Sequence, residues 1–381
     1  MTEFSIAGPG RIDFGRGVSA AAPGKIRALG ARGLVVHGAS PVRAGPMLAG
    51  LRDAGCAVET LACPSEPTLA MLLEGIVAAR EARAEWIVGI GGGSALDLAK
   101  AIAALAPARG RPEDHLEVVG PARPLEDEPL PFVAVPTVAG SGAEATPNAV
   151  IALPDAGRKV SLRDLRMLPR IAVVDPALTD GAPPEVTLGA GLDAVVQLAE
   201  AWVSTGATRF SDALVRPGLD AALRSRRVLS HTEDPAARDD LAWASLSGGL
   251  ALANAGLGAV HGLAGVLGAR SGAAHGPLCA TLFGPVLAAN RSAAPLGSSA
   301  ADRLVAVCAI LAEHLDCSEA EAPEAFAAWC RAAGVPALGQ IGVDPAIHSE
   351  IAEAALASRS MRSNPVRLSI ADLVGVLDRA S

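Results

Sequence analysis

The sequence predicts an α/β domain over residues 1–179 and an all-α domain over residues 180–381. In the first half, short apolar runs alternate with helical stretches, which is typical of buried parallel strands in βαβ units. After about Thr179, long segments rich in Ala, Leu and Val follow with helical spacing, and few β-like runs remain. Proline and glycine cluster between residues 175 and 184, which favours a domain boundary there.

Four short apolar runs are the expected strands of the first domain, and each is closed by glycine or proline turn residues. They lie at residues 34–37, 86–90, 132–135 and 171–174. A helix is expected over residues 44–54, after the first strand. The helices expected in the second domain include residues 187–204, 238–256, 299–315 and 320–333.

Composition and charge exclude several classes of protein. Half of the residues are hydrophobic and 19% are charged, so the chain is not disordered. The net charge of −8 and the lack of a basic tract argue against nucleic acid and anionic membranes as partners. No apolar run reaches the roughly 20 residues that span a bilayer, and the first residues lack a signal-peptide pattern. We therefore expect a cytoplasmic protein. Its six cysteines form no CxxC pair and are expected to be structural thiols.

The sharpest local signal is the run GGGSALDLAK, which begins at Gly91, follows an expected strand and opens a helix. Together with Gly92 and Gly93, Gly91 lets the backbone approach a ligand closely and adopt positive φ. Ser94 is the expected N-cap, and Asp97 gives a start like a capping box. Unpaired amides at such a helix start favour a phosphate or pyrophosphate. The alternative is a plain glycine-rich turn between strand and helix.

A second polar turn, PTVAGSGAE, follows the next expected strand and carries the hydroxyls of Thr137 and Ser141. Doubly wound sheets bind ligands at the carboxyl ends of their strands, where these small and hydroxyl-bearing residues fall. Two such loops after neighbouring strands predict a dinucleotide-binding cleft.

Four residues of the second half could bind a divalent cation: Asp193, Gln197, His261 and His275. The spacing of Asp193 and Gln197 places both on one helix face. A carboxylate, an amide oxygen and two imidazoles are suitable ligands and leave a position for a substrate oxygen, which the cation would polarise. The alternative, on the residues alone, is that the histidines are hydrogen-bonded core residues.

These motifs together resemble the iron-containing (group III) alcohol dehydrogenase family, which lies close to the maleylacetate reductases in the dehydroquinate synthase-like superfamily. The resemblance covers nearly the whole chain, and several ordered motifs are more specific than any one of them. The segments that carry it are 14–17, 91–103, 136–146, 158–159, 174–179, 191–200, 256–269 and 274–276.

The resemblance implies a dehydroquinate synthase-like fold that binds NAD(P) and a divalent metal, Fe²⁺ or Zn²⁺, in a cleft between the domains. It also implies a homodimer. By motif position, Thr137 and Ser141 would line the cofactor pocket, and Lys159 would approach the ribose. The residues that would hold the pyrophosphate and nicotinamide side are Gly91, Gly92, Gly93, Ser94 and Asp97.

The same resemblance implies that Asp193, His261 and His275 are metal ligands and catalytic residues. The substrate hydroxyl would lose its proton at the metal, and a hydride would pass to the nicotinamide ring. Two departures stand out, because the family commonly has histidine where Gln197 stands and often another where Gly265 stands. Gln197 still offers a carbonyl oxygen as a ligand, whereas Gly265 removes a proton-relay group.

These departures leave three hypotheses. The first is a metal-assisted alcohol dehydrogenase or carbonyl reductase that depends on NAD(P). The second is a metal-independent reductase of an unsaturated keto acid, of the maleylacetate reductase type. The third is a nucleotide-binding protein without catalysis. Ala, Leu and Val near the candidate site favour a small, mostly apolar alcohol or carbonyl substrate.

The residue after the first expected strand bears on cofactor choice. An acidic residue there would pair with the ribose 2′-hydroxyl and repel a 2′-phosphate. This chain has Gly38 instead, with Ser40 and Arg43 nearby. We therefore expect NADP rather than NAD. The alternatives are use of both cofactors, or use of NAD with Gly38 serving only to form a turn.

Overall fold

The computed structural model describes residues 3–117, 120–154, 158–231 and 233–381. Its contacts divide the chain into two compact units. The N-terminal unit is Ala7–Ala182, and the C-terminal unit is Pro183–Ser381 together with Met1–Ile6. This division falls close to the domain boundary predicted after residue 179, which stays a prediction.

A six-stranded sheet forms the centre of the N-terminal unit. Its strand order is β1-β8-β5-β4-β2-β3, and every neighbouring pair is parallel. The central strands β4, β5 and β8 are buried along their whole length, so their sequences are continuous apolar runs. The strands are β1 (Ile12–Phe14), β2 (Arg32–His37), β3 (Ala57–Ala62), β4 (Trp86–Gly91), β5 (Phe132–Pro136) and β8 (Ile171–Val174).

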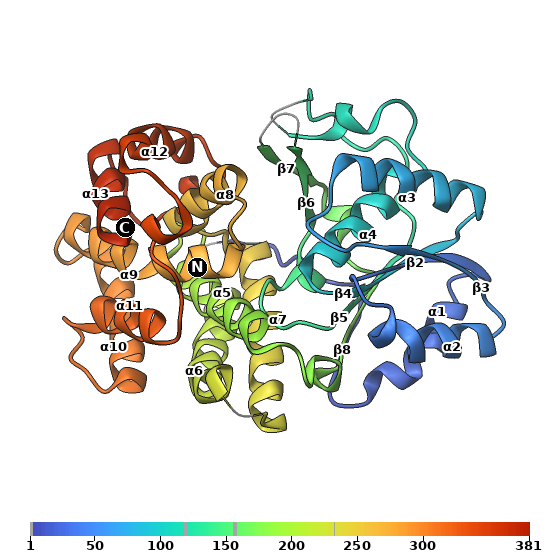
Figure 1. The fold of residues 1–381 in the computed structure, drawn as a ribbon, viewed down its shortest axis with the longest axis horizontal. Helices are drawn as coiled ribbons and strands as arrows, with labels where there is room; N and C mark the ends of the chain where they lie inside the picture. The colour runs from blue at the N-terminus through green and yellow to red at the C-terminus, as the bar shows by residue number, and fades with distance from the viewer. Residues whose placement is uncertain (1–2, 118–119, 155–157, 232) are drawn as a thin grey trace. The chain divides into compact units, whose positions relative to one another are not determined.

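Helices cover both faces of this sheet (Figure 1). Residues of α1 and α2 pack in the apolar cluster on one face, and residues of α3 and α4 pack in the cluster on the other. Val35 of β2 joins the first cluster and Leu34 the second, because successive side chains of a strand point to opposite faces. The helices are α1 (Ala22–Arg27), α2 (Gly45–Asp53), α3 (Leu69–Glu81) and α4 (Gly93–Leu105).

An antiparallel strand pair lies beside α4. It consists of β6 (Asn148–Leu153) and β7 (Arg158–Arg163). Lys100 of α4 is fully buried, and its ammonium donates hydrogen bonds to the carbonyls of Ala143 and Asn148 and to the hydroxyl of Thr146. This lysine therefore ties α4 to the segment that leads from β5 into β6.

The C-terminal unit is helical in the residues that the structure describes. Its core surrounds α5, which packs against α6, α7 and α9. The predicted order of an α/β domain followed by an all-α domain is confirmed. The helices are α5 (Pro184–Val203), α6 (Arg209–His231), α7 (Pro235–Ala255), α8 (Ala259–Ser271), α9 (His275–Ala293), α10 (Ser299–Leu315), α11 (Ala322–Ala332), α12 (His348–Leu356) and α13 (Ile370–Ala380).

Helix α5 is long and apolar enough to cross a membrane by length and composition. However, 78% of its most apolar window is buried inside the protein. Its apolar residues include Leu192, Val196 and Leu198, which belong to the core cluster of the C-terminal unit. The hydropathy of α5 is therefore that of a central core helix.

Candidate functional site

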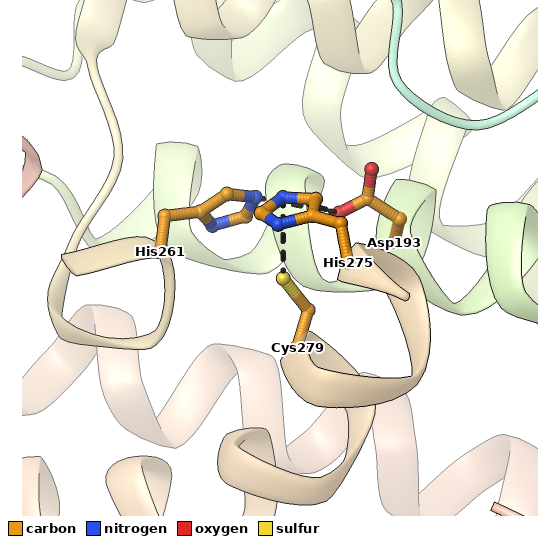
Figure 2. A group of neighbouring side chains, drawn as sticks. All are labelled: Asp193, His261, His275 and Cys279. Carbon is orange, nitrogen blue, oxygen red and sulfur yellow. Dashed lines mark hydrogen bonds and ion pairs between the residues drawn. The ribbon is translucent and has the colours of Figure 1, made fainter. Parts of the chain in front are cut away.

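Four side chains from three helices of the C-terminal unit converge on one place (Figure 2). Asp193 lies on α5, His261 in the first turn of α8, and His275 and Cys279 on α9. One potential ligand atom of each residue lies within 4.8 Å of those of the other three. We call Asp193, His261, His275 and Cys279 the tetrad.

The carboxylate of Asp193 lies close to both histidines of the tetrad. Its Oδ1 atom lies 3.4 Å from Nε2 of His261 and 3.7 Å from Nε2 of His275. The same nitrogen of His275 lies 3.5 Å from Sγ of Cys279. Asp193, His261 and Cys279 are buried or nearly so, whereas the His275 side chain is 44% exposed. The tetrad is therefore closed on most sides and open at His275.

Two further polar residues of α5, Glu200 and Gln197, orient side chains of the tetrad by hydrogen bonds. Oε2 of Glu200 lies 2.6 Å from Nδ1 of His261, and Oε1 of Glu200 accepts a hydrogen bond from the Val260 amide. The amide nitrogen of Gln197 donates to Oδ2 of Asp193 over 3.0 Å. Glu200 thus fixes the ring of His261, and Gln197 fixes the carboxylate of Asp193.

The tetrad attracts positive charge. Burial alone would raise the pKa of Asp193, but the nearby His275 and His261 lower it to about 2. Burial opposes protonation of His261, yet the charge of Cys279 and the nearby carboxylate of Asp193 raise its pKa well above the ordinary value. The charge of Cys279 has the largest effect on His275. Together with the charge of Asp193 it outweighs burial and raises the pKa of His275 to about 9. A metal ion would take the place of these protons.

The tetrad also contains buried atoms that lack hydrogen bonds, which is typical of metal ligands. Among the described residues, Oδ1 of Asp193 and Nε2 of His261 are buried without a hydrogen-bond partner. Leaving such an atom unpaired costs about 1–3 kcal/mol. A cation between them would satisfy both atoms. The oxygen, nitrogen and sulfur donors suit a transition metal such as Zn²⁺ or Fe²⁺ better than Mg²⁺ or Ca²⁺.

Sequence reasoning therefore named three of the four tetrad members, and the structure brings Asp193, His261 and His275 together. Their roles as metal ligands and catalytic residues stay predictions. Cys279 was not among the predicted ligands, because the cysteines were expected to be structural thiols. A signal was present, because Cys279 follows His275 by one helical turn and so shares its face of α9.

The glycine run lies where the sequence predicts, since β4 ends at Gly91 and α4 begins at Gly93. Two details of that prediction are wrong. Gly92 is the N-cap and no side chain caps the helix, so Ser94 already lies inside the first turn and no capping box forms. None of the three glycines has a positive φ. The carboxylate of Asp97 instead accepts a hydrogen bond from the Val150 amide of β6 over 3.0 Å.

Close packing explains the need for glycine in this run. A Cβ atom at Gly91 would lie 2.7 Å from Cβ of Ala95 and 3.2 Å from the amide nitrogen of Gly38. A Cβ atom at Gly93 would lie 2.8 Å from Oγ of Ser141. The run therefore touches both the turn after β2 and the turn after β5. The N-cap of α4 is Gly92, which has no side chain to cap the first amides of the helix, and such a helix start suits an anion.

The other predicted cofactor residues also lie in the N-terminal unit. The Thr137 amide donates to the Gly91 carbonyl over 2.9 Å, which joins the turn after β5 to the end of β4. Ser40 is exposed, and its hydroxyl accepts from the Val42 amide. Lys159 of β7 pairs with Glu66 over 2.7 Å. Thr137, Gly38 and Ser141 thus adjoin the glycine run, and their contact with a cofactor stays a prediction.

Two family models match the chain. The model described as iron-containing alcohol dehydrogenase matches residues 9–176. The model of the C-terminal part of the same family matches residues 187–381.

Individual relatives agree with these matches. The probable alcohol dehydrogenase EutG of Salmonella typhimurium is 34% identical over 76% of this chain and 76% of its own length. The 4-hydroxybutyrate dehydrogenase of Cupriavidus necator is 32% identical over 83% of each chain. The solved alcohol dehydrogenase from Oenococcus oeni has a TM-score of 0.89 and 26% identity, with 100% of both chains covered.

These names do not favour the maleylacetate reductase alternative. The chain belongs to the iron-containing alcohol dehydrogenase family and is an NAD(P)-dependent oxidoreductase that interconverts alcohols with aldehydes or ketones.

Proposed function

We propose that this enzyme interconverts a small, mostly apolar alcohol with its aldehyde or ketone, using NADP(H) and a divalent metal held by Asp193, His261 and His275. The observation that carries the proposal is that these three side chains converge, and that two of their buried atoms, Oδ1 of Asp193 and Nε2 of His261, lack hydrogen bonds. When bound, the metal would polarise the substrate oxygen, and the nicotinamide would exchange a hydride with the substrate carbon.

The protein's own residues prepare the tetrad for this chemistry. Glu200 takes Nδ1 of His261 as its partner, which leaves Nε2 of that ring as the ligand atom. The lowered pKa of Asp193 keeps its carboxylate ionised at neutral pH. The exposed side of His275 is the side on which a substrate oxygen would approach.

The N-terminal unit supplies the residues for the dinucleotide. In this proposal the uncapped amides at the start of α4, with Ser94 and Asp97, hold the pyrophosphate and the nicotinamide side. Thr137 and Ser141 line the pocket from the turn after β5, and Lys159 approaches the ribose from β7. Residues 1–179 then form the dinucleotide-binding domain, and residues 180–381 form the metal and substrate domain.

The preference for NADP rests on the end of β2. No atom lies within 4 Å of a Cβ placed at Gly38, so the position is open as well as uncharged. The exposed Ser40 can donate a hydrogen bond to a 2′-phosphate. Arg43 is held elsewhere, since its guanidinium donates to the carbonyl of Leu178. Ser40 is therefore the better candidate for 2′-phosphate contact.

The proposal includes a homodimer in the cytoplasm. The acidic net charge of −8 supports a freely dissolved protein, and the family resemblance supports the dimer. Light scattering of the purified enzyme measures its mass directly. A monomer would contradict the dimer without affecting the proposed chemistry.

A panel of short alcohols, aldehydes and ketones tests the function, with NADPH or NADH absorbance as the readout. Each reaction is run with Zn²⁺, with Fe²⁺ and with a chelator. We expect carbonyl reduction that the chelator abolishes and that one metal restores. Asp193→Ala and His261→Ala should lose activity by about 100-fold or more, whereas His314→Ala, outside the tetrad, should not. Normal turnover of both tetrad variants would contradict the metal-assisted mechanism.

A further inference from the structure

Cys279 takes part in the tetrad although the sequence contains no recognisable cysteine motif. Its Sγ atom is one of the four potential ligand atoms that lie within 4.8 Å of one another. Figure 2 shows the sulfur directed at the two imidazole rings from the next turn of α9. Cys279 is fully buried, so its thiol faces the tetrad and not the solvent.

Gln197 is the competing candidate for the fourth ligand, and its orientation argues against that role. Its amide nitrogen, which cannot ligate a metal, faces Asp193 at 3.0 Å. Its amide oxygen lies on the side of α7, 3.5 Å from where a Cβ of Gly248 would stand. Turning the amide around would place its oxygen against the carboxylate of Asp193, where the two oxygens repel each other. Gln197 therefore acts as a positioning residue for Asp193.

We propose that the thiolate of Cys279 is the fourth protein ligand of the metal centre, beside Asp193, His261 and His275, and that the centre takes zinc in preference to ferrous iron. The proposal rests on the proposed metal-assisted function and specifies its ligand set. Two independent observations carry it. The sulfur lies in the ligand group, and two buried atoms of the same group lack hydrogen bonds.

The preference for zinc follows from the donor atoms. Thiolate is a soft ligand that suits zinc, and zinc commonly accepts mixed sulfur, nitrogen and oxygen ligands. Zinc also binds a given set of ligands more tightly than ferrous iron does. Zinc can expand from four ligands to five, so four protein ligands would not prevent a substrate oxygen from binding. The oxygen would approach from the exposed side of His275.

Cys308 provides a matched control in the same unit. It is as buried as Cys279 and belongs to the same core cluster, but it lies on α10 and outside the tetrad. Burial raises the pKa of the Cys308 thiol to about 11, so this thiol stays protonated at neutral pH. Replacing it tests the effect of losing a buried thiol without touching the tetrad.

X-ray absorption spectroscopy of the zinc-loaded wild-type chain tests the proposal without any variant. We expect one sulfur neighbour at about 2.3 Å beside nitrogen and oxygen neighbours at about 2.0–2.1 Å. A shell of nitrogen and oxygen alone would overturn the role of Cys279, whether or not the enzyme is active. A chain that binds no metal at all would overturn both this proposal and the metal-assisted function.

Variants identify the source of the sulfur. Cys279→Ser should remove the sulfur neighbour and weaken zinc binding by about 100-fold or more, measured against a competing chelator, because even outer-sphere partners contribute about 10–100-fold. Cys308→Ser and Gln197→Ala should both keep the sulfur neighbour. Its loss in Cys308→Ser, or its persistence in Cys279→Ser, would overturn the assignment.

Competition between metals tests the choice of zinc. The metal-free wild-type chain is incubated without oxygen with equal amounts of Zn²⁺ and Fe²⁺, and the bound metal is measured by elemental analysis. We expect zinc to occupy the site, and Cys279→Ser to bind a smaller ratio of zinc to iron. Preferential retention of iron by the wild-type chain would contradict the preference for zinc.

Discussion

Oε2 of Glu200 lies 2.6 Å from Nδ1 of His261, and both groups are almost fully buried. The same carboxylate accepts a hydrogen bond from the Val260 amide in the first turn of α8. Glu200 of α5 therefore fixes both the start of α8 and the ring of His261. When a metal displaces the second proton of the His261 ring, the proton that remains on Nδ1 faces Glu200 and Nε2 becomes the ligand atom.

Glu200→Gln should weaken metal binding by about 10–100-fold, which is the usual cost of losing a carboxylate that orients a histidine ligand. Glutamine keeps an oxygen for the Val260 amide, so the fold should persist. The measurement is a zinc titration against a chelator, together with circular dichroism. Glu233→Gln serves as the control, because Glu233 pairs with Arg238 outside the tetrad. Zinc affinity equal to that of the wild type would contradict the role of Glu200.

The parts of the fold that the sequence predicts are those buried on both faces. The runs that became β4, β5 and β8 contain almost only apolar residues, because no side chain of a central strand meets water. The strands β1 and β3 lie at the two edges of the sheet, and their residues are mostly exposed. Their sequences, IDF and AVETLA, therefore lack a continuous apolar run and escaped prediction.

The sequence predicted only part of the site, because one of its residues is recognised by helix packing and not by a motif. Asp193, His261 and His275 are residue types that draw attention and that match motifs of a known family. Cys279 matches none of the cysteine spacings that identify a metal site, and only the packing of α9 against α5 and α8 reveals its neighbours. Ser94 was placed as an N-cap because it is the first hydroxyl after the glycines, but α4 begins earlier, at Gly93.

Gly91→Ala and Gly92→Ala should separate packing from cofactor binding. A Cβ at Gly91 meets Cβ of Ala95 at 2.7 Å, so the variant should lose roughly 1–3 kcal/mol of stability. A Cβ at Gly92 meets only Val138 at 3.5 Å, so that variant should fold normally. Gly92 is the N-cap of α4, where the pyrophosphate is proposed to bind. The methyl group that Gly92→Ala adds there should therefore weaken NADPH binding.

Chemical denaturation measures the stability of Gly91→Ala and Gly92→Ala, and fluorescence titration measures their affinity for NADPH. Gly92→Ala with wild-type stability and reduced NADPH affinity is the expected combination. Unchanged NADPH affinity in Gly92→Ala would argue against close approach of the cofactor to this glycine.

Asp175 should make the N-terminal unit sensitive to acid. Its buried carboxylate accepts hydrogen bonds from the amides of Gly17, Ser19 and Ala177 and from the Ser19 hydroxyl. Burial raises the pKa of Asp175, but these bonds outweigh burial and lower it below 3.8. A lowered folded-state pKa means that the stabilisation is fully present above pH 3.8 and is lost as the pH falls through the folded-state value.

Asp175→Asn should therefore cost about 1.5–3 kcal/mol of unfolding free energy at pH 7, which is typical of hydrogen bonds to a charged group. The difference from the wild type should shrink as the pH falls below 3.8 and through the lowered folded-state pKa of Asp175, where the wild-type carboxylate also becomes neutral. Urea unfolding monitored by fluorescence at both pH values provides the measurement. Asp53→Asn, at the end of α2, is the control. A difference that stays constant with pH would show that charge is not the cause.

Gly38→Asp should shift the cofactor preference from NADPH towards NADH. The position has room for a side chain, since no atom lies within 4 Å of an added Cβ, so the fold should accept the change. A carboxylate there would repel a 2′-phosphate and accept a hydrogen bond from a ribose 2′-hydroxyl. Unfavourable pairing of like charges should lower kcat/KM for NADPH by about tenfold or more, because such contacts cost several kcal/mol.

Steady-state kinetics with both cofactors measure the ratio of kcat/KM for NADPH to that for NADH. Gly45→Asp is the control, because Gly45 lies at the start of α2 and an added Cβ there also meets no atom. An unchanged ratio in Gly38→Asp would place the adenosine ribose away from the end of β2.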